Sequence, residues 1–181
     1  MRSVGKIYLL SGQIQSGKTS LCLDVIEIAR KQEFRLGGVV SPGVFQAREK
    51  IAIDLLDIRS GERRRLAESL GEGDPEIATQ RWAFRPDAVT WGNQILKNAV
   101  PCDLLVIDEL GPLEFHRGEG WVNGFKAVAS GDFRAALLVI RPSLLDEALG
   151  RWDVDRIINL DDSDQPHPSG EEIFRSLIQF G

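Results

Sequence analysis

The chain has 181 residues, 43% hydrophobic and 27% charged, so it can bury one sizeable core, and we expect a single domain over residues 1–181. Its net charge of −5 argues against nucleic acid or an anionic membrane as the main partner. We recognise no secretory leader, and no apolar run approaches the ~20 residues of a membrane helix. We therefore expect a cytoplasmic protein without a membrane partner.

The first half of the chain predicts strands interrupted by one helix. Residues 6–10 are a short apolar run typical of a buried strand, and from Gly17 onward the apolar residues recur with helical period. Two further strands are expected at 37–40 and 51–58. The polar residues 46–50 between them would form the tip of a hairpin.

In the second half, helices and strands alternate more regularly. A loop is expected at 71–75, and a helix begins at Pro86 or Asp87 and is broken by Pro101. The strongest strand of the chain covers 103–107. The remaining predicted elements are a helix at 121–129, a strand at 135–140, a helix from Pro142 to Gly150, a strand at 156–160 and a last helix with a capping box formed by Ser169 and Glu172.

This alternation indicates an α/β fold. It predicts a mostly parallel sheet with helices on both faces, into which one antiparallel β-hairpin is inserted. Cys22 and Cys102 each lie in an apolar stretch and match no metal-ligand spacing. We interpret them as small buried residues in a reducing compartment.

Residues 12–19 match the phosphate-loop pattern G-x-x-x-x-G-K-[ST] in full. Such a loop wraps phosphate in backbone N–H groups, and side chains at Gly12 and Gly17 would obstruct it. Lys18 can reach the β- and γ-phosphates, and Thr19 offers an oxygen to Mg²⁺. The candidate nucleotide-binding residues are Gly12, Gln13, Ile14, Gln15, Ser16, Gly17, Lys18, Thr19 and Ser20.

Asp108 and Glu109 follow the strongest strand and form the matching acidic pair. An aspartate at the end of a central strand can hold Mg²⁺ through its water shell, and the adjacent glutamate can accept a proton from an attacking water. Mg²⁺ is therefore the expected cofactor, with Thr19 and Asp108 as its candidate ligands. The sequence has no Asn-Lys-x-Asp motif for reading guanine, which argues against a dedicated GTPase.

Several basic residues are candidates for contact with phosphate. Arg141 ends the strand that precedes it, so it could touch the γ-phosphate as an arginine finger in cis, or be a surface arginine before a helix. Arg48 and Lys50 lie at the predicted hairpin tip and could swing toward phosphate. Arg59 and the arginines at 63–65 favour a solvated hairpin edge over a substrate grip. The candidate catalytic residues are Lys18, Glu109 and Arg141.

The chain contains, in order, the segments GQIQSGKTSL, GGVVSPG, LLDIRSGERRRLA and LLVIDELGPLEF. With these segments it resembles the small nucleoside-triphosphatases first described from thermophiles, a family that includes the cancer-related nucleoside-triphosphatase of animals. The resemblance covers nearly the whole chain. It implies a RecA-like P-loop NTPase fold and Mg²⁺-dependent hydrolysis of ATP, GTP and other nucleoside triphosphates. It also implies phosphate binding by residues 12–19, a metal role for Asp108 and activation of water by Glu109.

Two departures from the family pattern stand out. The family usually follows its second strand with a Thr-x-Glu-x-Arg-like stretch, whereas residues 41–45 read Ser-Pro-Gly-Val-Phe and lack the glutamate and the arginine. A catalytic cation would then come from Arg48 or elsewhere, or be absent. The third loop position, often proline in the family, is Ile14. Neither change removes a phosphate-binding group.

Two other functions share the phosphate loop. A nucleotide or nucleoside kinase would need a second substrate site, usually with an arginine-bearing lid, and no clear lid insertion follows the helix expected after Arg117. A nucleotide-gated binding module would use the hairpin between Ser41 and Ile58 as its moving part. A product assay distinguishes the three functions. Free phosphate would indicate a nucleoside-triphosphatase, a phosphorylated acceptor a kinase, and tight binding without turnover a binding module. The sequence indicates neither a preferred base nor an oligomeric state.

Overall fold

The computed structural model describes residues 5–71, 78–164 and 166–179. It contains a nine-stranded sheet in the order β6-β5-β4-β2-β7-β8-β1-β9, and β3 pairs with β4 outside this path. The strands are β1 (Lys6–Ser11), β2 (Leu36–Val40), β3 (Gly43–Gln46), β4 (Glu49–Asp57), β5 (Arg63–Ser69), β6 (Trp82–Phe84), β7 (Cys102–Leu110), β8 (Phe133–Ile140) and β9 (Arg156–Asn159). The α-helices are α1 (Lys18–Lys31), α2 (Ala78–Arg81), α3 (Pro86–Lys97), α4 (Val122–Ser130), α5 (Leu145–Arg151) and α6 (Gly170–Ile178).

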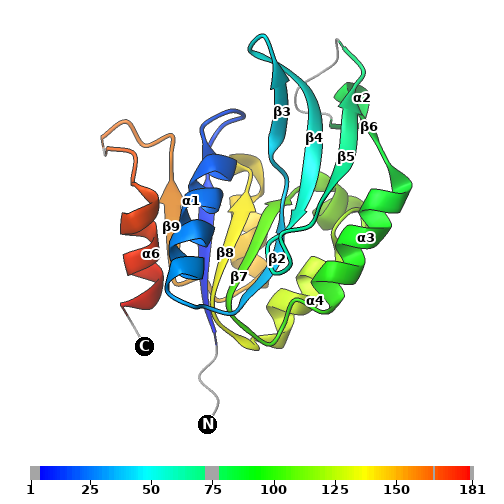
Figure 1. Ribbon diagram of the computed structural model, residues 1–181. Coiled ribbons are helices and arrows are strands. Elements are labelled where there is room, and N and C mark those ends of the chain that lie inside the picture. Colours follow the sequence, from blue (N-terminus) through cyan, green and yellow to red (C-terminus); the bar gives the residue numbers. More distant parts are fainter. Residues whose placement is uncertain (1–4, 72–77, 165, 180–181) are drawn as a thin grey trace.

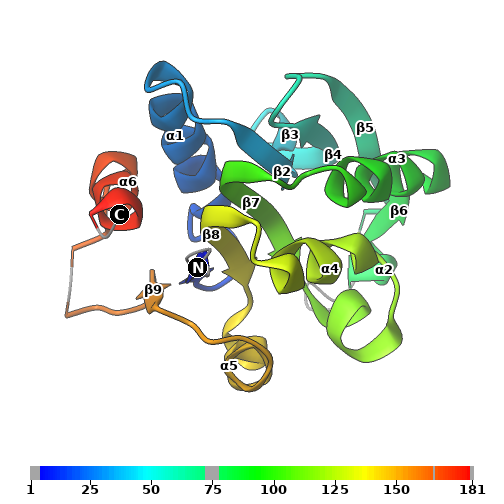
Figure 2. The ribbon, with the colours of Figure 1, turned by 90° about the horizontal axis from the view of Figure 1, so that it is seen from below.

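Strands β9, β1, β8, β7 and β2 are all parallel, and we call them the parallel half. Helices α1 and α6 cover one face of it, while α3, α4 and α5 lie on the other (Figure 2). Neighbouring residues of one strand therefore enter two different cores: Leu9 packs with the second group of helices and Leu10 with the first. This explains why these strands are almost continuously apolar.

The predicted parallel sheet with helices on both faces is confirmed, but its antiparallel part is larger than one hairpin. Strands β3, β4, β5 and β6, which we call the antiparallel extension, pair antiparallel with one another, and β4 joins them to β2. The β3–β4 hairpin rises beyond the parallel strands at the top of the view (Figure 1). The arginines at 63–65 lie on β5 of the β4–β5 hairpin, where Arg63 and Arg64 are exposed, as expected of a solvated hairpin edge, and Arg65 pairs with Asp54 of β4 at 2.7 Å.

The two glycines that begin the GGVV segment are required by close backbone approach. A Cβ at Gly37 would lie 2.0 Å from the carbonyl oxygen of Ala99, and one at Gly38 would lie 1.9 Å from that of Val106. Gly38 also has a φ of +119°, which side chains rarely adopt. A larger residue at Gly38 would push β2 away from β7, the strand that carries the acidic pair, and one at Gly37 would collide with the chain that leaves α3.

Most of the predicted boundaries hold, with instructive exceptions. Strand β7 continues to Leu110, so Asp108 and Glu109 lie inside it, and its pairing with β8 becomes irregular between Ile107 and Leu110. A π-helical turn at Leu113–Arg117 was not predicted. Helix α5 begins at Leu145 rather than Pro142, because Pro142–Leu144 form a 3₁₀ turn, and it extends one residue past Gly150. The loop predicted at 71–75 lies, beyond Gly71, outside the described residues.

The expected burial of the two cysteines and the expected capping box are confirmed. Cys22 and Cys102 are both buried and free. At α6, the Ser169 N–H donates to Glu172 Oε2 at 2.7 Å and the Glu172 N–H donates to Ser169 Oγ at 3.2 Å, which is a complete capping box. Within the part of the chain that the structure describes, no helix is long and apolar enough to cross a membrane.

Candidate active site

The candidate site lies at the carboxyl edge of the parallel half. The loop that joins β1 to α1 contains the phosphate pattern, Asp108 and Glu109 lie near the end of β7, and Arg141 directly follows β8. These strands are neighbours in the order β7-β8-β1, so the fold brings together groups that are more than 120 residues apart in sequence. The same edge faces upward in Figure 1. Ligands of open α/β sheets bind in the crevice at this edge.

The loop has the backbone that its two glycines predict. Gly17 has a φ of +92°, and a Cβ at Gly12 would lie 2.6 Å from Ser16 Oγ. Helix α1 begins immediately afterwards, without a side-chain cap and without an acidic residue in its first turn. Its first N–H groups and the positive end of its dipole therefore face the loop, as anion binding requires. Of the other predicted residues, Gln13, Ile14, Gln15 and Ser20 are exposed and Ser16 is half-buried.

Lys18 is buried at the centre of this loop, with 8% of its surface exposed. Its Nζ donates to the carbonyl oxygens of Gly12 and Gln13, both at 2.6 Å, and to Ser16 Oγ at 3.3 Å. Burial lowers the pKa of Lys18, while the charges of Glu109 and Asp108 act to raise it. The loop thus fixes one ammonium group where phosphate is expected to bind.

Thr19 and Asp108, the two predicted metal ligands, are in direct contact. Thr19 Oγ1 donates to Asp108 Oδ2 at 2.8 Å, and the Ser41 N–H lies 3.3 Å from the same oxygen. Burial and then the charge of Glu109 raise the pKa of Asp108 to about 6. A divalent cation would relieve this crowding of negative charge, and hydroxyl and carboxylate oxygens are the ligands that Mg²⁺ accepts.

A protein-only metal cage is absent from the described residues, where no three His, Cys, Asp or Glu side chains converge. Mg²⁺ at phosphate sites usually keeps several waters and takes one or two protein oxygens, with the phosphates supplying others. The pair formed by Thr19 and Asp108 fits that kind of site, and it would not fit a site built from protein ligands alone.

Glu109 and Arg141 form an ion pair across β7 and β8, with Arg141 Nε donating to Glu109 Oε1. The Arg141 side chain is 17% exposed and that of Glu109 is 30% exposed. Arg141 is therefore partly buried and paired with the candidate base, and its role as an arginine finger stays a prediction. The structure places a cation beside the candidate base, at the edge where the phosphate loop also lies.

Two further acidic residues shape the site and were not predicted to do so. Asp161, in the loop after β9, accepts the Gln13 N–H at 2.9 Å. Glu114 is buried and accepts the N–H groups of Gly111 and Trp121 at 2.8 and 2.7 Å, which fixes the chain that leaves β7. Burial raises the pKa of Glu114. Only Glu114 had a sequence signal, as the last acidic residue of the LLVIDELGPLEF segment.

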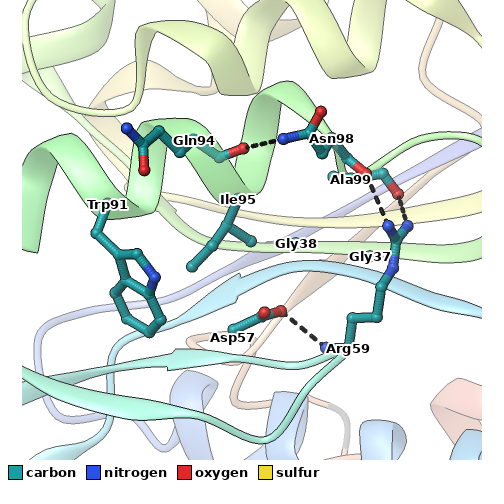
Figure 3. A pocket seen from close by; sticks show the side chains of 9 residues that line it. All are labelled: Gly37, Gly38, Asp57, Arg59, Trp91, Gln94, Ile95, Asn98 and Ala99. Atoms are coloured by element: carbon teal, nitrogen blue, oxygen red, sulfur yellow. Dashed lines mark hydrogen bonds between the residues drawn. The ribbon is translucent and has the colours of Figure 1, made fainter.

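A separate pocket of about 250 Å³ lies where β2 begins, at the opposite edge from the phosphate loop. Figure 3 shows Trp91 and Ile95 of α3 on one side of it and Arg59 on the other. The Arg59 guanidinium donates to the carbonyl oxygens of Leu36, Asn98 and Ala99 at 2.6–3.0 Å. Arg59 thus satisfies carbonyls at the end of α3, which is a structural role, and no predicted site residue lines this pocket.

Comparison with known proteins agrees with this arrangement. A model of the NTPase family matches residues 7–129, which include the phosphate loop and the Asp108-Glu109 pair. This chain belongs to the NTPase family. Arg141 and Asp161 lie beyond the segment that the NTPase model matches, so the family match does not bear on either residue.

Curated relatives of this NTPase carry the name nucleoside-triphosphatase THEP1. The protein from Pyrobaculum islandicum is 32% identical over 106 residues, which are 59% of this chain and 58% of that protein. The protein from Methanopyrus kandleri is 25% identical over 132 residues, 72% of this chain and 71% of that protein. The chain therefore matches little more than half the length of the first relative.

Solved structures extend the likeness to the whole fold. A human cancer-related nucleoside triphosphatase, 20% identical, covers 98% of this chain and 100% of its own with a TM-score of 0.69. THEP1 from Aquifex aeolicus, 13% identical, covers 96% of this chain and 97% of its own with a TM-score of 0.60. The predicted P-loop NTPase fold is confirmed.

Proposed function

We propose that this protein hydrolyses nucleoside triphosphates to the diphosphate and inorganic phosphate. The observation that carries this proposal is the meeting of Lys18, Thr19 and Asp108 at one edge of the sheet, with Thr19 Oγ1 2.8 Å from Asp108 Oδ2. The names of the THEP1 relatives and of the human structural neighbour support the same activity. ATP, GTP and other nucleoside triphosphates are the expected substrates, because every identified contact addresses phosphate or metal rather than the base.

Mg²⁺ is the proposed cofactor, with Thr19 and Asp108 as its protein ligands. When bound, Mg²⁺ neutralises charge on the β- and γ-phosphates and on the developing products. The proposed ligands already point at one another, and Ser41 holds the Asp108 carboxylate in place through its N–H. The site therefore needs little rearrangement of these two side chains to accept the ion.

The chemistry of the chain's own residues follows from their positions. The loop and Lys18 bind and orient the phosphates, and Glu109 accepts a proton from a water as its oxygen attacks the γ-phosphorus. The bond between the γ-phosphorus and the oxygen that bridges it to the β-phosphate breaks, which releases the nucleoside diphosphate and inorganic phosphate. Because Arg141 is paired with Glu109, its guanidinium lies where it can also stabilise charge on the transferred phosphoryl group.

Phosphate release with Mg²⁺, measured in parallel on ATP, GTP, CTP and UTP, tests the proposal. We expect turnover on all four, with kcat/KM values that differ by less than about a hundredfold. Glu109→Gln should lower kcat by about 10²–10⁴ while triphosphate binding survives, because the variant keeps the shape of the side chain but loses the base. Glu119→Gln is the matched control, since the side chain of Glu119 is 55% exposed and pairs with Arg117 at the surface.

Each alternative outcome points to a specific error. Turnover that persists unchanged in Glu109→Gln would remove Glu109 from the role of base. Transfer to a nucleotide or nucleoside acceptor without free phosphate would indicate a kinase. Tight triphosphate binding without turnover in the wild type would favour the nucleotide-gated module, and the absence of binding would refute the proposal.

A further inference from the structure

The β3–β4 hairpin carries Lys50 toward the candidate site. Lys50 lies directly across from Phe45 in the pairing of the two strands, and its side chain is half-buried. Its Nζ lies 5.2 Å from the centroid of the Trp82 ring of β6. A Cβ at Gly43 would lie 2.7 Å from Lys50 Cε, so the glycine leaves room for the lysine stem.

An irregularity in the hairpin determines which way Lys50 faces. Val44 pairs with Ala52 and Phe45 pairs with Lys50, which leaves Ile51 as an extra residue on β4. In a regular ladder Phe45 would pair with Ile51, and Lys50 would point to the opposite face of the hairpin. A β-bulge is a common device for redirecting a side chain beside an active site. Here it turns Lys50 to the same face as Phe45 and Gly43.

The base of the hairpin is fastened to Asp108. Ser41, between β2 and β3, donates its hydroxyl to the Asp108 carbonyl oxygen at 3.0 Å, in addition to its N–H contact with the carboxylate. Burial lowers the pKa of Lys50, and the nearby charges of Asp108 and Glu109 act against that effect. Lys50 in turn acts to lower the pKa of Asp108. The lysine and the acidic pair therefore share one electrostatic environment.

The ammonium group of Lys50 has hydrogen-bonding capacity to spare. Among the described residues it makes no hydrogen bond and no ion pair within 4 Å, and it lies against the Trp82 ring. An ammonium has three donors, and a half-buried one gains from an anionic partner. The strand order puts Arg141 on one side of the acidic pair, after β8, and Lys50 on the other, on β4. A phosphoryl group between them would meet a cation from each side.

We propose that Lys50 contacts the terminal phosphoryl group of a bound nucleoside triphosphate, as a further side-chain cation that the hairpin delivers to the site. This inference rests on the proposed function, because it takes a nucleoside triphosphate as the ligand. It assigns the role to Lys50 rather than to Arg48, which is exposed at the turn of the hairpin. It also gives the hairpin a direct part in distinguishing triphosphate from diphosphate.

The test compares three variants of the full chain with the wild type. Lys50→Met keeps the length and the apolar contact with Trp82 but removes the charge, Lys50→Arg keeps the charge, and Arg48→Met removes a neighbouring cation from the same hairpin. For each, kcat is measured by phosphate release with Mg²⁺, and Kd is measured for fluorescent analogues of ATP and ADP. Thermal unfolding shows whether each variant is folded.

Lys50→Met should lower kcat about 10–100-fold and lower the preference for ATP over ADP about tenfold, as expected for one lost charge-assisted contact. Lys50→Arg should recover most of kcat and most of the preference for ATP, and Arg48→Met should resemble the wild type.

A change in melting temperature alone, with kcat and the preference for ATP intact, would show that Lys50 only neutralises Asp108 and Glu109 and would overturn the inference. If the wild type binds ATP without hydrolysing it, the proposed function fails while the Kd ratio still decides the role of Lys50. If it binds neither nucleotide, both proposals fail.

Discussion

The parallel half and the antiparallel extension use charged side chains in opposite ways. In the parallel half, Lys18 and Asp108 are buried at the carboxyl edge of the sheet, and their partners are other groups of the same site. In the extension, the arginines of β5 are matched locally: Arg65 pairs with Asp54 at 2.7 Å and Arg64 lies over the Trp91 ring at 4.2 Å. The buried charges lie at the candidate site, whereas the arginines of β5 have partners outside it and a small structural role.

The energetic reason lies in the cost of burial. A buried charge is expensive unless it is paired, so an uncompensated one persists mainly where a ligand or reaction uses it. An exposed ion pair contributes only about 0–1 kcal/mol to folding. Substitutions at the carboxyl edge should therefore affect catalysis or binding strongly, and substitutions in β5 should affect stability slightly. Lys50 is the exception, because it belongs to the extension but faces the site.

Arg141→Ala is expected to produce the largest effect. If its guanidinium stabilises the phosphoryl group in the transition state, kcat should fall by about 10³–10⁵ while KM changes little. Steady-state phosphate release measures both, and Arg141→Lys indicates whether charge alone is sufficient. A loss of less than tenfold in a folded variant would confine Arg141 to positioning Glu109.

Lys18→Ala should produce the next largest effect, on binding rather than on turnover alone. Removing one ammonium from contact with phosphate costs about 1.5–3 kcal/mol, which is roughly 10–150-fold in Kd. Titration with a fluorescent triphosphate measures it. Lys31→Ala is a suitable control, since Lys31 is in the last turn of the same helix and its side chain is 72% exposed. Unchanged affinity would place the ligand elsewhere.

The sequence predicted the parallel half well because its signals are local. The spacing of Gly12, Gly17 and Lys18 encodes a backbone shape and a charge within eight residues, and apolar runs identify strands that are covered on both faces. The acidic pair was placed correctly at the sheet edge, although the strand runs through it to Leu110. Little tertiary information was needed for these features.

The extension and the surroundings of the site depend on contacts that no local pattern encodes. Strand β5 contains three arginines in succession, and it is a strand because its backbone pairs with β4 and β6; Asp54 and Trp91 then provide partners for two of the arginines. Asp161 and Gln13 are 148 residues apart in sequence. Asp161 reaches the Gln13 N–H only because β9 pairs with β1. The direction in which Lys50 points depends on a one-residue bulge, and hydrophobic periodicity gives no sign of it.

Arg64→Ala should produce the smallest effect and is the sharpest test of the contrast. Its guanidinium lies 4.2 Å from the centroid of the Trp91 ring of α3, so it joins β5 to the helix that covers this face. Arg64 also pairs with Glu62 at 2.7 Å. An exposed cation–π contact contributes about 0.5–1 kcal/mol and an exposed ion pair about 0–1 kcal/mol, so the free energy of unfolding in urea should fall by about 0.5–2 kcal/mol.

Arg63→Ala is the matched control, because Arg63 is the adjacent arginine, is 52% exposed and has only a distant pair with Asp54 at 3.9 Å. It should change the free energy of unfolding by less than about 0.5 kcal/mol. Both variants should keep kcat within about twofold of the wild type, since the contacts of both arginines are with Asp54, Glu62 and Trp91, outside the phosphate loop and the acidic pair. A tenfold loss of kcat in Arg64→Ala at normal stability would mean that β5 reaches the substrate. The division between a catalytic parallel half and a structural β5 would then be wrong.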